Sequence, residues 1–182
     1  QYPALKALDL KAFDAQLDYL SRHYQFVTMD TVMALFNGTQ VDLPPNPILL
    51  TFDDGYADHF RYVFPRLFDR GIPGAFYPAP ATAIDRQMLD ANRVHFVLAA
   101  IGNPDALIEM IETGIEAGRA AHQLWTIEQY RAEFMTASRF DEPRVAYAKR
   151  MLQFVLPDRL RRSIADAAFR RFVSRDEPGF AE

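Results

Sequence analysis

The sequence predicts an α/β fold in the first half of the chain and a helical region in the second half. Residues 48–52, Ile-Leu-Leu-Thr-Phe, form an apolar run that is typical of a strand covered on both faces in a parallel sheet. Apolar side chains then recur at helical spacing through residues 60–68, and residues 74–77 supply a second strand. From Asp90 onward only helical spacing recurs, so no further strand is expected.

Two helices and a short strand are predicted before the apolar run. The first helix follows Asp9, a candidate N-cap, and ends near Tyr24. Residues 25–28 then form a short strand. Asp30 is the candidate N-cap of a second helix, which stops at Gly38 because glycine readily adopts the left-handed conformation at a helix C-terminus.

A rigid connector and a β-α-β unit follow. The three prolines within residues 44–47 predict a connector outside helix and sheet, and Pro65 predicts a kink in the helix of residues 60–68. The two strands should be parallel, and active sites lie in the loops after such strands. Helical and strand spacing places five aromatic side chains in the core rather than on a platform for sugar rings: Phe60, Phe64, Phe68, Phe76 and Tyr77.

The second half contains further helix signals. Thr126 and Gln129 form a candidate capping box, and Trp125 before them is a candidate hydrophobic staple. Asp141 and Asp158 are further candidate caps, and the arginines that follow Asp158 alternate with aspartates, which predicts a solvated helix face with ion pairs. We expect residues 1–85 to form the N-terminal part of an α/β domain and residues 86–182 a helical insertion or C-terminal helical region.

Composition excludes several classes of protein. The 20 basic and 24 acidic residues give a net charge of -4, which argues against binding to nucleic acid or an anionic membrane. The absence of cysteine excludes a disulfide scaffold and a thiolate metal site. No apolar run approaches the roughly 20 residues that span a bilayer, and no signal-peptide pattern is present, which favours a cytoplasmic protein without a membrane span.

The small number of strands predicts an incomplete sheet. Two or three parallel strands leave open edges, whereas closed α/β barrels take about 250 residues. We therefore expect either that the sheet continues beyond Glu182 in a longer protein or that another subunit covers the open edge, as in a homo-oligomer.

Asp53 and Asp54 are the strongest candidates for chemistry, because they are adjacent carboxylates at the end of a predicted buried strand. Like charges repel, and a metal ion between them would relieve the repulsion. One aspartate is then a candidate metal ligand and the other a candidate acceptor of a proton from water. Gly55 permits a sharp turn at this point, and the alternative interpretation is a plain Asp-Asp-Gly turn with both carboxylates solvated.

The segment Leu50-Thr51-Phe52-Asp53-Asp54-Gly55-Tyr56 resembles the first motif of the polysaccharide deacetylases, the NodB-homology group of carbohydrate esterase family 4. The resemblance covers about Phe13 to Tyr77. It implies a distorted (β/α) barrel and the removal of N- or O-acetyl groups from a polysaccharide or amino sugar. It also implies that Asp53 is the general base and that Asp54 is a ligand of zinc or a similar divalent metal.

Three further residues follow the motif and are candidates for contacting the sugar or orienting the base: Tyr56, Asp58 and His59. A position near the site competes with a surface or packing role for His59, and with a helix cap for Asp58. His95 is expected to be partly buried, and His23 and His122 to be solvated.

The chain departs from the family at its metal site. The family completes the site with a His-x-x-x-His pair, and the four histidines here, at positions 23, 59, 95 and 122, contain no such pair. Because catalytic zinc usually has three protein ligands, we expect the other ligands to lie outside this chain and the 182 residues alone to be inactive.

Three alternatives stay open at this point. The chain is a non-catalytic homologue that binds glycan, a related amide hydrolase, or a receiver-like domain whose paired acids hold magnesium. The last needs a phosphoacceptor aspartate after a third strand, and no acid after Tyr77 lies on a recognisable strand.

Overall fold

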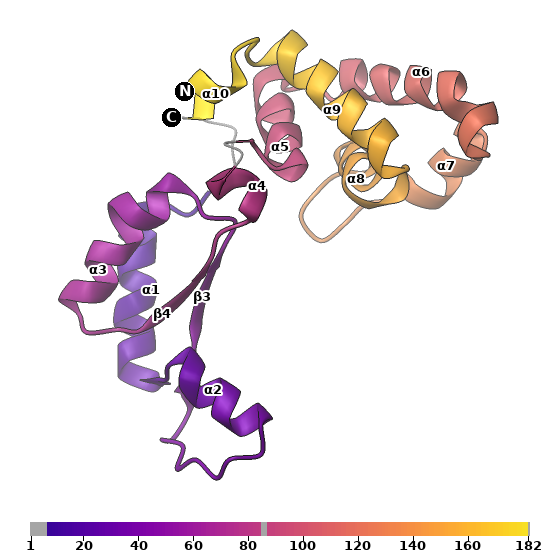
Figure 1. The fold of residues 1–182 in the computed structure, drawn as a ribbon. Coiled ribbons are helices and arrows are strands. Elements are labelled where there is room, and N and C mark those ends of the chain that lie inside the picture. Colours follow the sequence, from indigo (N-terminus) through magenta and orange to yellow (C-terminus); the bar gives the residue numbers. More distant parts are fainter. Residues whose placement is uncertain (1–6, 85–86, 182) are drawn as a thin grey trace. The chain divides into compact units, whose positions relative to one another are not determined.

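The computed structural model describes residues 7–84 and 87–181 of the chain (Figure 1). It contains two compact units, one within Ala7–Asp85, here called the α/β unit, and one within Arg86–Glu182, here called the helical unit. The boundary predicted between residues 85 and 86 lies outside the described residues. None of the described helices is long and apolar enough to cross a bilayer.

The α/β unit alternates helices with short strands (Figure 1). Its elements are α1 (Leu10–His23), β1 (Gln25–Phe26), α2 (Met29–Phe36), β2 (Pro47–Ile48), β3 (Leu50–Asp53), η1 (His59–Val63), α3 (Phe64–Asp69), β4 (Gly74–Tyr77) and α4 (Pro80–Ala83). The β-α-β unit predicted from the sequence is confirmed, because β3 and β4 are parallel and are joined through η1 and α3.

Side-chain caps define where the first two helices begin. The Asp9 carboxylate accepts a hydrogen bond from the Ala12 amide at 2.7 Å, so the predicted cap of α1 is confirmed. The prediction for α2 is wrong, because its N-cap is Thr28 and Asp30 lies in its first turn. The backbone at Thr28 is still extended, with φ -88° and ψ 164°, which lets its hydroxyl accept from the Thr31 amide as an N-cap does.

The strands form two parallel pairs, β1 with β2 and β3 with β4. The predicted connector is wrong at its last residue, since Pro47 opens β2. The proline is tolerated because the amides of Gln25 and Val27 donate to the carbonyls of Asn46 and Ile48, at 3.1 and 2.9 Å, so the pairing never requires an amide from Pro47. The described residues form no closed barrel.

Only one face of the β3–β4 pair is packed. Leu50 and Phe52 join a cluster around Leu17 of α1 and Leu67 of α3, while Thr51 on the other face is exposed. The expectation that the strand is covered on both faces is therefore wrong for the described residues. The run of residues 48–52, predicted to be one strand, is divided in the structure: Ile48 ends β2, Leu50 begins β3, and Leu49 lies between the two strands.

The predicted kink at Pro65 takes the form of a π-helical turn, η1, directly before α3. The amide of Phe64 donates to the carbonyl of His59, five residues earlier, and Pro65 then occupies the first turn of α3, where no amide is required.

The five aromatic side chains predicted to be in the core are all exposed: Phe60, Phe64, Phe68, Phe76 and Tyr77. The prediction is wrong for the helix because Val63 and Leu67 form the stripe that packs toward the strands.

The helical unit consists of helices, and no strand follows β4 in the described part of the chain, as predicted. Its elements are α5 (Asp90–Ile101), α6 (Asp105–His122), α7 (Ile127–Phe134), α8 (Pro143–Arg150), η2 (Met151–Val155), α9 (Asp158–Phe172) and α10 (Glu177–Ala181). Their apolar stripes meet in one core, whose most buried members include Leu107, Ile111, Ile115, Tyr147, Met151, Leu152 and Phe169.

The predicted features at the start of α7 are confirmed. Thr126 and Gln129 form a capping box, and the ring of Trp125 packs on that of Tyr130 with 5.5 Å between centroids. The other two predicted caps are wrong. Asp141 instead forms an ion pair with Lys149 at 2.7 Å, and Asp158 is the first residue of α9, where it pairs with arginines one turn further along the helix.

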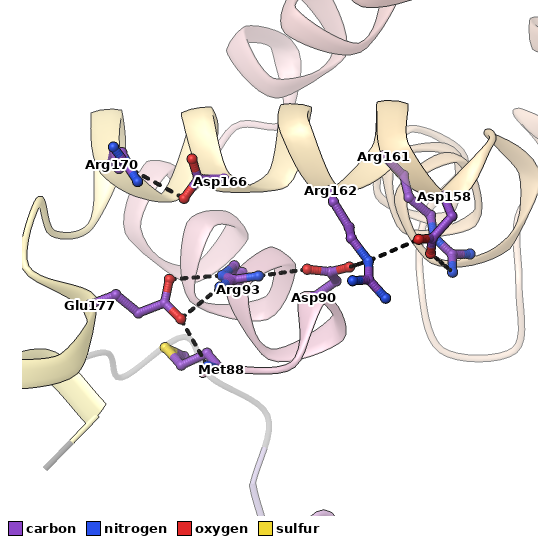
Figure 2. A network of polar contacts seen from close by, with 9 residues as sticks. All are labelled: Met88, Asp90, Arg93, Asp158, Arg161, Arg162, Asp166, Arg170 and Glu177. Atoms are coloured by element: carbon purple, nitrogen blue, oxygen red, sulfur yellow. Dashed lines mark hydrogen bonds and ion pairs between the residues drawn. The ribbon is translucent and has the colours of Figure 1, made fainter. Parts of the chain in front are cut away.

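A network of charged side chains fastens α10 to α5 (Figure 2). The Arg93 guanidinium donates to Glu177 through Nε and Nη2, at 2.9 and 2.7 Å, and to Asp90 through Nη1 at 2.6 Å. Glu177 also accepts from the Met88 amide at 2.8 Å. Burial disfavours the charged guanidinium, but Glu177 and Asp90 outweigh it and raise the pKa of Arg93.

We expect Glu177→Gln to lower the free energy of unfolding of the helical unit by about 2 kcal/mol, because it leaves the Arg93 charge only partly compensated. The Arg93 and Glu177 side chains are 13% and 17% exposed. Asp166→Asn is the matched control, because it breaks a pair with Arg170 in which Arg170 and Asp166 are 66% and 42% exposed. The control should change stability by less than about 0.5 kcal/mol in urea unfolding. Equal losses in the two variants would contradict the structure.

A second prediction concerns Tyr147, whose buried hydroxyl has no hydrogen-bond partner among the described residues. Burial and then the Glu112 charge raise the pKa of Tyr147 to about 12. In the unfolded chain Tyr147 ionises at its ordinary pKa of 10.0, which is lower than its pKa in the folded protein. The free energy of unfolding is therefore expected to be fully present below pH 10 and to decline as the pH rises toward 12. Tyr147→Phe should weaken this alkaline decline and leave stability at neutral pH within about 1 kcal/mol, as measured by unfolding across pH. A large loss at neutral pH would show that the hydroxyl has a partner.

Candidate active site

The candidate site is the turn at the carboxyl end of β3. Asp53 is the last residue of the strand and is exposed, and Asp54 after it is half-buried. Asp54 and Gly55 both adopt left-handed backbone conformations, with φ of 73° and 72°. Asparagine and aspartate tolerate this conformation better than most side chains do, and glycine adopts it freely. The sequence Asp-Asp-Gly therefore suits a sharp turn that ends the strand.

Packing makes Gly55 necessary as well. A Cβ atom at this position would lie 2.8 Å from Cβ and 3.0 Å from Cα of Pro78. The Thr82 hydroxyl lies 3.1 Å from the Asp54 carbonyl oxygen and 2.7 Å from that of Ala79. The segment after β4 thus holds the backbone of the turn in place.

The register of the strands explains this contact. Asp53 of β3 is paired with Tyr77 of β4, so both parallel strands end at the same edge of the sheet. Sequence reasoning did not single out Pro78 or Thr82. The available signal was their position directly after the second strand of a parallel pair, where loops converge.

His59 lies among aromatic rings next to the turn. Its ring centroid is 5.5 Å from that of Tyr56, 5.6 Å from that of Phe52 and 6.1 Å from that of Phe76. Its Nδ1 atom is buried and has no hydrogen-bond partner in the described part of the chain. The structure therefore brings Tyr56 and His59 together, while their predicted roles toward a substrate stay predictions.

The remaining candidates are Asp58, His23, His95 and His122. Asp58 is exposed and makes no capping hydrogen bond to η1, so the alternative role as a cap is not observed. His23 and His122 are exposed on α1 and α6, as predicted. The expectation that His95 is partly buried is wrong, because its side chain is exposed on α5. Desolvation by neighbouring protein atoms and then the Lys149 charge lower the pKa of His95.

The described residues do not complete a zinc site. Within residues 7–84 and 87–181, no three His, Cys, Asp or Glu side chains are arranged to hold a metal ion. Asp53 and Asp54 can supply two carboxylates, whereas catalytic zinc usually has three protein ligands. The turn accordingly provides an exposed carboxylate and a half-buried one, but not a full ligand set.

Comparison with known protein families matches residues 40–149 to the family described as polysaccharide deacetylase. The match spans more than half of the chain and includes β2, β3 and β4 together with the Asp53–Gly55 turn. Searches of the curated proteins and of the solved structures found no match.

We expect Gly55→Ala to lower the free energy of unfolding of the α/β unit by about 3 kcal/mol, through left-handed strain and overlap with Pro78. Gly38→Ala is the matched control, because Gly38 has a φ of 76° but no neighbouring atom within 4 Å of the position that a Cβ would take. The control should lose only about 1 kcal/mol, from backbone strain alone. Chemical denaturation of both variants measures the difference, and equal losses would show that Pro78 does not press on the turn.

Proposed function

Because the chain belongs to the polysaccharide deacetylase family, we propose that it serves the hydrolytic removal of acetyl groups from an acetylated polysaccharide or amino sugar. The observation that carries the proposal is the family match across the Asp53-Asp54-Gly55 turn. The position of the turn supports it, since active sites of parallel α/β folds lie at the carboxyl ends of their strands.

The proposed reaction transfers an acetyl group to water. The water oxygen attacks the acetyl carbonyl carbon, and the bond from this carbon to the sugar nitrogen or oxygen breaks. Acetate and a sugar amine or hydroxyl are released. The water loses a proton to a base, which returns it to the leaving group.

Asp53 is the proposed base. It is exposed at the strand end, so a water molecule and a sugar can reach its carboxylate. The left-handed conformation of the next residue, Asp54, turns the chain away directly after it. The strand pairing to β4 holds the backbone of Asp53 in place, which favours a fixed position for the proton acceptor.

Asp54 is proposed as one ligand of a divalent cation, and the family resemblance favours zinc. A cation of this kind polarises an acetyl carbonyl and lowers the pKa of water. The described residues do not complete its ligand set. We propose that the missing ligands come from outside these 182 residues, in further native sequence or in another chain.

The incomplete ligand set also favours a second candidate function. A homologue that keeps the turn but lacks the metal ligands would bind glycan without hydrolysing it. The two functions differ in one measurable property, since only the first predicts acetate release once the ligand set is complete.

We expect the purified 182-residue chain to release no more acetate from N-acetylglucosamine oligomers than buffer does, with or without added zinc. The reason is that the described side chains form no three-ligand metal site. Enzymatic detection of acetate measures the outcome. Zinc-dependent release that disappears in Asp53→Asn would contradict the proposal that ligands are missing and would support Asp53 as the base.

The native coding sequence on both sides of these residues distinguishes the two functions. If it encodes further histidine or acidic ligands, the longer protein should release acetate, and Asp53→Asn should lower its kcat at least about a hundredfold. Asp30→Asn, in the first turn of α2, is the control and should leave kcat unchanged. Glycan binding without acetate release by the longer protein would favour the non-catalytic function.

A further inference from the structure

Tyr77 lies beside the proposed base, Asp53, on the same face of the β3–β4 pair. The register pairs these two residues as the last residues of their strands. Paired residues of neighbouring strands are about 4.8 Å apart, and their side chains lie on the same face of the sheet. The preceding pair shows this arrangement directly, because the rings of Phe52 and Phe76 stack with 4.9 Å between their centroids.

The face that carries Asp53 and Tyr77 is not the face that forms the core of the α/β unit. Phe52 belongs to the core cluster, and side chains alternate along a strand, so the next pair lies on the opposite face. The other pair on this opposite face consists of Thr51 and Ala75. Both are small, whereas Tyr77 is 44% exposed, so within this group of four Tyr77 supplies the broad apolar surface next to the carboxylate.

The backbone around the turn fixes the position of Tyr77 relative to Asp53. The strand pairing joins the two residues directly. Pro78, which follows Tyr77, packs against the turn so closely that a Cβ atom at Gly55 would lie 2.8 Å from its own Cβ. A residue that is already held in its binding position loses less conformational entropy when a ligand arrives.

The chemistry of a tyrosine suits contact with a sugar. Its ring combines an apolar face with a polar hydroxyl at one end, and a pyranose ring combines a face of C–H groups with hydroxyls at its rim. Since the two strands are about 4.8 Å apart, a sugar stacked on Tyr77 would have its substituents within reach of the Asp53 carboxylate. One residue pair would then supply both the proton acceptor and a surface that holds the substrate.

We propose that Tyr77 is a substrate-binding residue, which stacks on the acetylated sugar unit and holds it beside Asp53. The identity of the ligand rests on the proposed function, whereas the position of the contact rests on the strand register. Stacking of this kind requires the aromatic ring and not the hydroxyl, so affinity for the sugar should survive Tyr77→Phe and fall in Tyr77→Leu.

Fluorine NMR of the 182-residue chain labelled with fluorotyrosine, titrated with a tetramer of N-acetylglucosamine, tests where the sugar binds. The loss of one signal in Tyr77→Phe identifies the Tyr77 resonance. The expected result is a shift of this resonance that saturates as the tetramer is added, while the Tyr62 resonance stays in place. Tyr62 is the matched control, because it is 42% exposed and lies in η1, away from the strand ends.

Isothermal titration calorimetry of the unlabelled chain with the same tetramer measures the contribution of the ring. Tyr77→Leu should weaken binding about fivefold or more, and Tyr77→Phe should stay within about twofold of the unsubstituted chain. Tyr62→Leu should leave the affinity unchanged. Unchanged thermal unfolding of each variant, followed by circular dichroism, would show that lost binding is not a lost fold.

The outcomes separate this contact from the proposed function. A Tyr77 resonance that does not shift at millimolar tetramer, or equal affinities of the unsubstituted chain and Tyr77→Leu, would overturn the contact. Acetate release by the longer protein with a KM that Tyr77→Leu leaves unchanged would also overturn it, and would leave the proposed function intact. Tyr77-dependent binding without acetate release by the longer protein would support the contact and overturn the hydrolytic function.

Discussion

The parallel pairing of β3 with β4 is the constraint on which the candidate site depends. Two parallel strands cannot be joined by a tight turn, so η1 and α3 must cross between them. The register that pairs Asp53 with Tyr77 ends both strands at one edge. The segment after β4 then reaches the turn after β3, where Pro78 leaves room only for glycine at position 55.

The crossover also decides which surfaces of the α/β unit are buried. The π-helical turn ends at Val63, and Pro65 follows in the first turn of α3. Val63 and Leu67 face the strands and complete the small core with Leu17 of α1. Phe60, Phe64 and Phe68 lie on the adjacent surface as a consequence and are exposed, so one helical segment packs on the sheet with one row of side chains and leaves another row uncovered.

The helical unit is stabilised in a different way. Its helices bury one large apolar core, and the short helix α10 is held by ion pairs and by Phe180, whose ring lies 5.0 Å from that of Phe96 and 5.3 Å from that of Phe169. Glu177 joins α10 to the start of α5 through the Met88 amide and the Arg93 guanidinium (Figure 2). All of these contacts are between residues of the helical unit, and none of them involves a residue of the candidate site.

The sequence by itself determined the positions of most helices, the β-α-β unit, the capping box at Thr126 and the Asp53-Asp54-Gly55 turn. These features depend on residues close together in the chain, where spacing, hydrogen-bonding side chains and glycine act locally. Only the tertiary structure decided which row of α3 is buried, that one face of β3 is open, and that Pro78 and Thr82 hold the turn. Those outcomes depend on contacts between segments far apart in the sequence, and local periodicity carries no information about which partner covers an apolar surface.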